Sequence, residues 1–400
     1  MVNSVLAMPR RSHPTIWRRG GSRSKPWGET LTMILSPGRP NLPSRGLYRS
    51  GPRRAQRAKT GEHRKTLAEV EYMFYAGRMA RAQYTEIHCK SALNRVQGMP
   101  FAWSLNPYRG CRHRCLYCYA RVTHTFFGLN AGADFDAAIF VKTNLAQVLR
   151  NELRRASWRR EPIAIGTATD PYQPIEGRYR LTRACLEVLA EQANPANITT
   201  KGTLVARDVD VLQELAKQAG CGVNISLITL DETIWRAFEP GTPPPLKRLA
   251  VMRRLVDAGV PCGLALAPVL PRLTDSLPAL EMVVQAAVDH GAAWLWSGTL
   301  HFEPAVRDWF LAGLGRHFPE LAPAYVRVFG AAGASEGSSY APRAYADALA
   351  ERVNALKARY DLHWEERPTP RLGQVAPPAV AIAADACPNR SMAHQLPLPC

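Results

Sequence analysis

Two kinds of hydrophobic periodicity alternate along the middle of the chain. From about residue 100, short β-branched or apolar runs predict strands at 102–105, 163–167, 197–200, 223–228, 263–269 and 293–297. Between them, apolar residues recur at helical spacing, as in Leu145, Val148, Leu149 and Leu153. Six such repeats predict an α/β fold, a parallel sheet curled into a partial (β/α)6-type or full barrel. An open doubly wound sheet is the alternative, but no glycine-rich dinucleotide fingerprint follows the first strand.

Residues typical of helix ends fall where these repeats need them. Asp208 is a predicted N-cap, and Gly220 and Gly259 are predicted to close two helices. A further helix is predicted at 344–360. We therefore divide the chain into a basic extension at 1–83, a core barrel at 84–335, a helical segment at 336–366 and a tail at 367–400.

Positive charge is concentrated at one end of the sequence. The formal net charge is +18, but residues 1–70 hold 15 Lys and Arg against 3 Glu, whereas the other 330 residues hold 36 basic against 30 acidic residues. The basic end has no helical or strand periodicity, so we expect a disordered, solvated extension. A nucleic-acid-binding arm is the alternative. The nearly balanced core gives that alternative little support.

Neither a membrane span nor a disulfide scaffold is indicated. The longest apolar run, at 262–270, is broken by Gly263 and Pro268 and is shorter than the roughly 18 residues that a spanning helix needs. Nine cysteines in 400 residues are too few for a disulfide-rich scaffold, and no export signal is evident. We expect a reduced, cytoplasmic protein with no membrane partner.

The strongest chemical signal is a cluster of three thiols just past the first predicted strand. The sequence reads Asn106-Pro-Tyr-Arg-Gly-Cys111-Arg-His-Arg-Cys115-Leu-Tyr-Cys118. Thiolates at this spacing can each ligate a different iron of an iron–sulfur cubane, leaving the fourth iron open for catalysis. Zinc held by a Cys/His quartet that includes His113 is the rival, but its ligands would be crowded around one tetrahedral ion. We expect His113 instead to lie at the surface.

This loop resembles that of a known superfamily. A C-x3-C-x2-C loop with an aromatic residue, Tyr117, before the last cysteine is similar to that of the radical S-adenosylmethionine (SAM) superfamily. The stretches 106–111, 169–176 and 200–202 resemble its spore-photoproduct-lyase-like branch, and most of all an uncharacterised actinobacterial group. The resemblance runs from about Tyr84 to about Leu362.

The resemblance implies a set of cofactors and a reaction type. A [4Fe-4S] cluster would be held by Cys111, Cys115 and Cys118, and SAM would be cleaved reductively to a 5'-deoxyadenosyl radical that abstracts hydrogen from an unknown substrate. A low-potential electron donor of the flavodoxin or ferredoxin type would supply the electron. The resemblance and the strand-end placement together give the expected SAM-binding residues: Tyr117, Thr167, Thr169, Asp170, Lys201 and Ser226.

One departure from the branch concerns hydrogen transfer. Spore photoproduct lyase uses a cysteine donor near the second strand, and residues 163–170 contain none. This argues against the same relay, although tyrosines such as Tyr117 and Tyr119 are alternative carriers. Arg236, Glu239 and Pro240 either face the substrate or end a helix. A different class of function, a non-enzymatic zinc or nucleic-acid binder that uses the basic extension, stays as the alternative.

Overall fold

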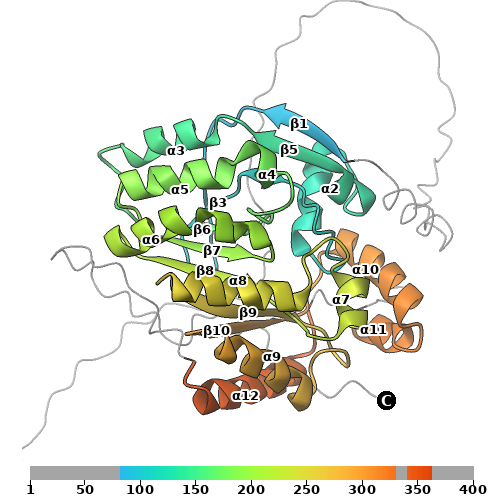
Figure 1. Cartoon of the computed structure of the whole chain (residues 1–400). Helices are drawn as coiled ribbons and strands as arrows, with labels where there is room; N and C mark the ends of the chain where they lie inside the picture. The colour runs from blue at the N-terminus through green and yellow to red at the C-terminus, as the bar shows by residue number, and fades with distance from the viewer. Residues whose placement is uncertain (1–81, 330–339, 363–400) are drawn as a thin grey trace, which may run out of the picture. The chain divides into compact units, whose positions relative to one another are not determined.

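The structure is a computed structural model, and it describes residues 82–329 and 340–362 (Figure 1). Nearly all of the expected basic extension and the whole of the expected tail lie outside these ranges. The predictions of disorder and the proposed domain boundaries therefore stay predictions. None of the helices in the described ranges has the length and apolar character needed to cross a bilayer.

A seven-stranded sheet forms the centre of the described chain. Its order is β10-β9-β8-β7-β6-β3-β2, parallel throughout except for the antiparallel edge pair β2–β3. The six predicted strands are the six parallel ones, so the predicted partial barrel is confirmed. The strands are β2 (Leu93–Arg95), β3 (Trp103–Leu105), β6 (Ile163–Ile165), β7 (Ala196–Thr200), β8 (Cys221–Ser226), β9 (Cys262–Val269) and β10 (Leu295–Thr299).

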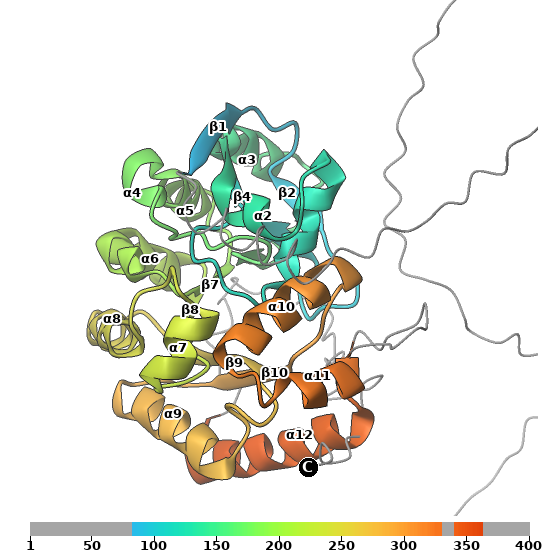
Figure 2. The same cartoon turned by 90° about the vertical axis from the view of Figure 1, so that its right-hand side faces the viewer.

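Helices cover the outer face of this sheet, and Figure 2 turns the carboxyl ends of the strands toward the viewer. Because both faces of a parallel sheet are packed, its central strands lack exposed positions; all six residues of β8 are buried. The helical elements are η1 (Tyr119–Phe127), α2 (Ala133–Ala137), α3 (Leu145–Leu153), α4 (Glu176–Tyr179), α5 (Leu181–Glu191), η2 (Thr203–Asp208), α6 (Val209–Gln218), α7 (Glu232–Phe238), α8 (Pro245–Asp257), α9 (Leu277–Asp289), α10 (Pro304–His317), α11 (Ala322–Phe329) and α12 (Arg343–Arg359).

A tryptophan side chain packs against two neighbouring strands near their amino ends. Trp294 is 1% exposed, and its indole N–H donates to Asn224 Oδ1 at 2.8 Å. A Cβ atom at Gly263 would lie 2.0 Å from the indole Nε1, and one at Gly222 would lie 3.2 Å from the ring. These two glycines therefore make room for the ring.

A small second sheet was not predicted from the sequence. It consists of β1 (Gln83–Ile87), β5 (Ala138–Lys142) and β4 (Tyr108–Arg109), in the order β1-β5-β4. Four of the five β1 residues are exposed, so this strand lacks the alternation that predicts a half-buried strand. The sheet supports the segment that leads into the cysteine loop, because β4 ends two residues before Cys111.

The predicted helix-end residues all lie at the ends of helices, but Asp208 does not cap its helix through its side chain. Gly220 and Gly259 follow α6 and α8 with φ of +92° and +77°, the left-handed conformation that closes helices. Asp208 occupies the N-cap position of α6, but its side chain makes no capping hydrogen bond. Its buried carboxylate instead accepts from Arg207 at 2.7 Å and lies 3.3 Å from Arg183.

Candidate functional site

The three cysteines lie on one loop at the carboxyl end of the parallel sheet, between β4 and η1. Cys111 and Cys115 are buried and Cys118 is half-buried. The loop is a pair of tight turns, because the amide of Arg114 donates to Cys111 O at 3.4 Å and the amide of Cys118 to Cys115 O at 3.3 Å. Arg114 has a φ of +60°, which lets the chain reverse between the first two thiols.

Side chains from the loop after β6 hold the start of the cysteine loop. Gln173 is fully buried; its Oε1 accepts from the amide of Arg112 at 3.0 Å and its Nε2 donates to Gly110 O at 3.1 Å. The Thr169 hydroxyl donates to the same carbonyl at 2.6 Å. The predicted residue Thr169 therefore positions the loop backbone.

A buried arginine holds the middle of the loop. Arg121 is fully buried, and its Nε donates to Cys115 O at 2.9 Å. Its charge is balanced by Asp136, 3.1 Å away, which also pairs with Arg114 at 3.0 Å. The guanidinium lies 5.1 Å from the ring centroid of Trp309 on α10. The loop is thus tied to α2 and α10.

The segment after α7 packs directly against the other side of the loop. The amide of Gly241 donates to His113 O at 3.0 Å, and a Cβ at this position would lie 2.2 Å from Arg112 O. The amide of Leu116 donates to Phe238 O at 2.9 Å. Only glycine fits such a backbone approach without a shift.

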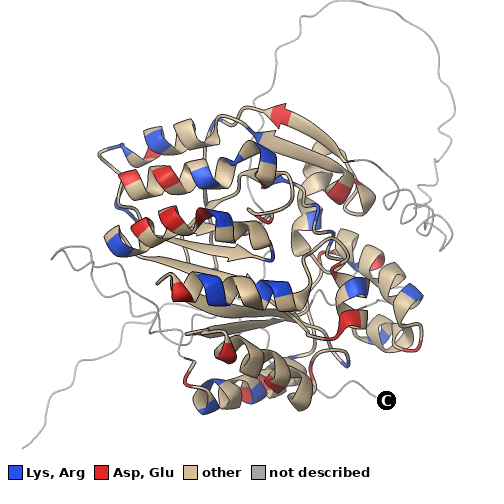
Figure 3. Ribbon diagram, viewed as in Figure 1, with Lys and Arg blue, Asp and Glu red and all other residues tan. Residues whose placement is uncertain are grey.

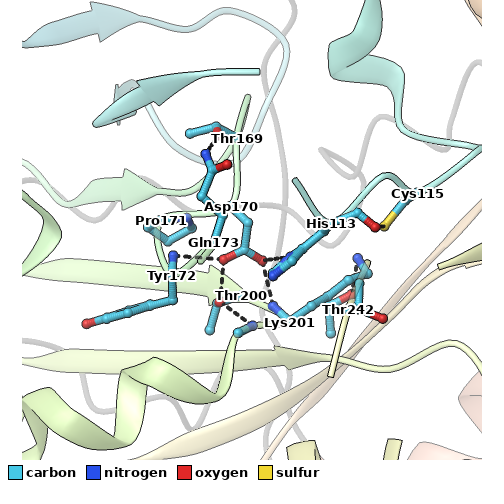
Figure 4. Close-up of polar contacts among 12 residues, drawn as sticks. His113, Cys115, Thr169, Asp170, Pro171, Tyr172, Gln173, Thr200, Lys201 and Thr242 are labelled. Carbon is cyan, nitrogen blue, oxygen red and sulfur yellow. Dashed lines mark hydrogen bonds and ion pairs between the residues drawn. The ribbon is translucent and has the colours of Figure 1, made fainter. Parts of the chain in front are cut away.

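Asp170 is the polar centre of the neighbouring strand ends (Figure 4). Its carboxylate accepts from the Tyr172 amide at 2.9 Å, the Thr200 hydroxyl at 2.6 Å and the Lys201 amide at 2.7 Å, and lies 3.0 Å from His113 Nδ1. Burial raises the pKa of Asp170, but the charge of His113 and these hydrogen bonds outweigh it and lower the pKa to about 2. The predicted residue Asp170 therefore joins β6, β7 and the cysteine loop.

The expectation that His113 lies at the surface is wrong. The residue is 2% exposed, although arginines flank it on both sides. Its ring lies against Asp170, as Figure 4 shows, so it is already engaged by a carboxylate. A zinc quartet would need this ring to turn toward the thiols instead.

Lys201, at the end of β7, is joined to two other residues that the sequence singles out. Its ammonium donates to Ser226 Oγ at 2.9 Å and lies 5.6 Å from the ring centroid of Tyr117. Burial lowers the pKa of Lys201, but the negative charges that Cys115 and Glu239 can carry raise it by a larger amount. The net shift of the pKa is therefore upward. A positive charge is therefore held close to the Cys115 thiol.

A buried ion pair close to Lys201 is not predicted from the sequence. Arg248 Nη2 lies 2.5 Å from Glu239 Oε2, and each residue is 1% exposed. Glu239 also accepts from the Tyr117 hydroxyl and lies 3.8 Å from Lys201 Nζ. Glu239 therefore ends α7 as its C-cap residue and is also part of a buried ion pair. Arg248 Nη1 donates to Ser226 O at 3.0 Å, which ties the pair to the end of β8.

The remaining predicted residue, Thr167, has a different neighbour. Asn106 Nδ2 donates to Thr167 Oγ1 at 3.1 Å, and Asn106 Oδ1 accepts from the Ala168 amide at 2.8 Å. Asn106 begins the Asn-Pro-Tyr-Arg-Gly-Cys stretch, so this contact links the first and second parallel strands. All six predicted side chains therefore lie at the carboxyl end of the sheet. The structure joins the side chains of Tyr117, Lys201 and Ser226 in one network, links Asp170 to the Lys201 amide, and gives Thr167 and Thr169 other partners.

The surroundings of the three thiols fit an iron–sulfur cubane better than a single metal ion. Burial raises the pKa of Cys111 and Cys118 and brings that of Cys115 to about 12, and binding a metal would reverse this effect by stabilising the thiolate. Among residues 82–329 and 340–362, no three His, Cys, Asp or Glu side chains converge on a position for a single metal ion. A cubane needs no such convergence, because each thiolate binds its own iron.

Comparison with known proteins identifies the family. The model of the radical SAM superfamily matches residues 105–280. An uncharacterised protein of Mycobacterium tuberculosis is 43% identical over 290 residues, which cover 72% of this chain and 84% of that protein. An uncharacterised protein of Methanocaldococcus jannaschii is 26% identical over 196 residues, 49% of this chain and 71% of that protein.

The chain belongs to the radical SAM superfamily. Membership in this superfamily implies an enzyme that uses a [4Fe-4S] cluster and SAM, whereas the reaction is not set by it. A spore photoproduct lyase variant shares the fold with a TM-score of 0.54 at 16% identity, over 74% of this chain and 83% of that one. The same lyase in complex with a dinucleoside spore photoproduct gives 0.52 at 16% identity, over 76% and 85%. At this identity the likeness concerns the fold.

Proposed function

We propose that this radical SAM protein binds its [4Fe-4S] cluster through Cys111, Cys115 and Cys118. The observation that carries the proposal is the placement of all three thiols on one loop, held from three sides at the carboxyl end of the parallel sheet. This end is where the reactive groups of β/α barrels gather. Bound there, the cluster would supply one-electron reductive cleavage of SAM and, through it, hydrogen abstraction from a substrate.

The polar network beside the loop is suited to SAM. Lys201 keeps a positive charge near Cys115, and Ser226 orients its ammonium from 2.9 Å. An ammonium and a hydroxyl can bind the carboxylate and ribose of SAM. The ring of Tyr117 lies under the same ammonium and is fixed through its hydroxyl by Glu239. We propose that Tyr117, Lys201 and Ser226 contact SAM.

Thr167, Thr169 and Asp170 are proposed to act as positioning residues. The Thr169 hydroxyl donates to Gly110 O and the Asp170 oxygens accept three hydrogen bonds. With these bonds made, the two side chains fix the distance between the cysteine loop and Lys201. Thr167 is held by Asn106 in the same region. We expect their substitution to change SAM affinity less than that of Lys201.

The proposed reaction needs an electron donor and a substrate, which are other molecules. The proposal needs a low-potential one-electron donor of the flavodoxin or ferredoxin type. Residues 163–170 contain no cysteine that could donate hydrogen, so the substrate and net reaction are left open. The likeness to spore photoproduct lyase motivates irradiated DNA as one substrate to test.

The proposal is tested by SAM cleavage under anaerobic conditions. Reconstituted protein is mixed with SAM and dithionite, and 5'-deoxyadenosine is measured by chromatography with and without irradiated DNA. We expect the product from the unaltered chain and none from Cys115→Ala. The matched control is Cys185→Ala, because Cys185 is fully buried in α5, away from the loop, and this variant should retain cleavage. Product formation by Cys115→Ala, or none by an unaltered chain with a full cluster, would contradict the proposal.

A further inference from the structure

Five exposed arginines gather at the amino end of the parallel strands. Arg95 ends β2, Arg154 and Arg155 follow α3, and Arg159 and Arg160 lie in the loop before β6. Figure 3 shows the basic positions at the left end of α3 and in the chain that leaves it. We call these five residues the arginine patch. They lie at the opposite end of the sheet from the cysteine loop.

A pair of indoles brings the two parts of the patch together. The rings of Trp103, on β3, and Trp158, between Arg155 and Arg159, are 5.4 Å apart at their centroids. The Arg95 guanidinium lies 5.8 Å from the centroid of Trp103. The arginines from β2 and from the loop at 154–160 therefore form one surface, although about sixty positions separate them in the sequence.

The charges of the arginine patch are only partly balanced, because Arg154 acts on Glu191 and Glu161 follows Arg160 in the sequence, but neither carboxylate makes a salt bridge with the patch. Within the described ranges, no salt bridge joins any of the five to a carboxylate. Glu152 is occupied by the Ala92 and Leu93 amides, and Glu191 is paired with Arg150 through two contacts of 3.1 Å. Like charges within a Debye length repel each other. The patch is therefore a locally positive surface that attracts anions.

Some exposed arginines elsewhere on the surface are paired within their own helix. On α8, Arg253 lies 3.0 Å from Asp257, one helical turn away. On α7, Arg236 lies 2.6 Å from Glu232. Other exposed arginines in the described ranges, such as Arg254 and Arg272, also make no salt bridge, so what sets the patch apart is that five such arginines lie together. This clustering points to an external partner with repeated negative charges.

We propose that the arginine patch binds the phosphate backbone of a nucleic acid. The planar guanidinium has a fork of donors that matches phosphate oxygens and is weakly hydrated, which makes arginine suited to this contact. Five arginines on one surface offer more positive charge than a single small anion would neutralise, whereas a nucleic-acid strand carries several phosphates. Because the patch and the cysteine loop occupy opposite ends of the sheet, the bound strand is a tether that locates the protein, and it is not the molecule presented to the thiols.

Salt dependence gives the sharpest test. Each phosphate neutralised contributes about 0.9 to the slope of log K against log salt for duplex DNA and about 0.7 for single strands. The test variant is Arg155→Gln/Arg159→Gln in the full chain, which avoids Arg160 and its φ of +53°. The matched control is Arg253→Gln/Arg254→Gln on α8, which removes the same charge. Labelled 20-nucleotide RNA and DNA, single-stranded and duplex, are titrated by fluorescence anisotropy at several salt concentrations.

The patch variant should bind at least tenfold more weakly at low salt, with its slope reduced by about 1.8 for duplex and about 1.4 for single strands. The control should keep the slope of the unaltered chain. The melting temperature of the patch variant should not fall, because repulsion is relieved. Comparison of the affinities for the RNA and DNA probes shows which kind of strand is the tether.

Equal slopes for the patch and control variants would overturn the proposal. So would loss of binding only when three arginines of the basic extension, Arg53, Arg54 and Arg57, are changed. Neither result depends on the cluster.

Discussion

The two ends of the parallel sheet treat their charged residues in opposite ways. At the carboxyl end Arg121 and Arg248 are buried and Asp170 has a side chain only 9% exposed, and each lies within 3.1 Å of an ionisable partner. At the amino end the arginine patch is exposed and, among the described residues, without salt bridges. The difference follows from desolvation. A buried charge is stable only when paired and hydrogen-bonded, whereas water solvates an exposed one.

This comparison predicts that substitutions of charged residues lower the folding stability much more at the carboxyl end than at the amino end. A site that must hold three thiols and a cofactor needs fixed backbone, and buried ion pairs fix it by leaving few alternative arrangements. An exposed surface that meets a partner needs no such rigidity.

The largest effect is expected from Arg248→Met. Glu239 would then be buried with one of its two positive neighbours removed, because Arg248 lies 2.5 Å away and Lys201 is 3.8 Å away. Breaking a buried ion pair costs about 3–5 kcal/mol of folding free energy. Chemical denaturation under anaerobic conditions measures it. The control is Glu239→Gln/Arg248→Met, which should recover a large part of the loss. A single variant as stable as the unaltered chain would contradict the pairing.

An intermediate, pH-dependent effect is expected from Asp170→Asn. Folding lowers the pKa of Asp170 to about 2, below the roughly 3.9 of an unfolded chain. The carboxylate therefore contributes about 2 kcal/mol of stability above pH 5, and this contribution is lost as the pH falls toward 2. Unfolding curves of the variant and the unaltered chain should differ at pH 7 and converge near pH 2. A difference that does not change with pH would show that Asp170 is uncharged or unpaired in the folded chain.

The smallest effect is expected from Arg150→Ala near the amino end. Arg150 makes two contacts of 3.1 Å with Glu191, but the two side chains are 27% and 49% exposed. Exposed pairs of this kind contribute about 0.2–1 kcal/mol. Thermal melts should shift by no more than a few degrees. A loss comparable with that of Arg248→Met would remove the distinction between the two ends.

The sequence predicts the parts of the fold that depend on local periodicity. The six parallel strands were predicted from apolar runs, and Gly220 and Gly259 from their positions after helical patterns. The cysteine loop was predicted because its spacing carries chemistry by itself. Lys201 and Ser226 followed from their places at strand ends, and the structure brings them within 2.9 Å of each other.

The features that the sequence did not predict depend on contacts between distant segments. His113 is flanked by two arginines and was expected at the surface, yet Asp170, 57 positions later, holds it in the interior. Glu239 and Arg248 carry no motif, and their pairing becomes visible only when α7 and α8 are placed beside the cysteine loop. A charged residue between charged neighbours looks the same in sequence whether it is exposed or paired in the interior.

The central claim is that three of the nine cysteines hold one cluster at the carboxyl end. Iron and sulfide content, with the electron paramagnetic resonance of the reduced protein before and after SAM is added, tests it most directly. We predict about four irons and four sulfides per chain, a spectrum that changes with SAM, and loss of both in Cys111→Ala, Cys115→Ala and Cys118→Ala. Cys262→Ala, a buried cysteine at the start of β9, should leave both intact. Full iron content in any of the three loop variants, or a spectrum that SAM does not alter, would contradict the account.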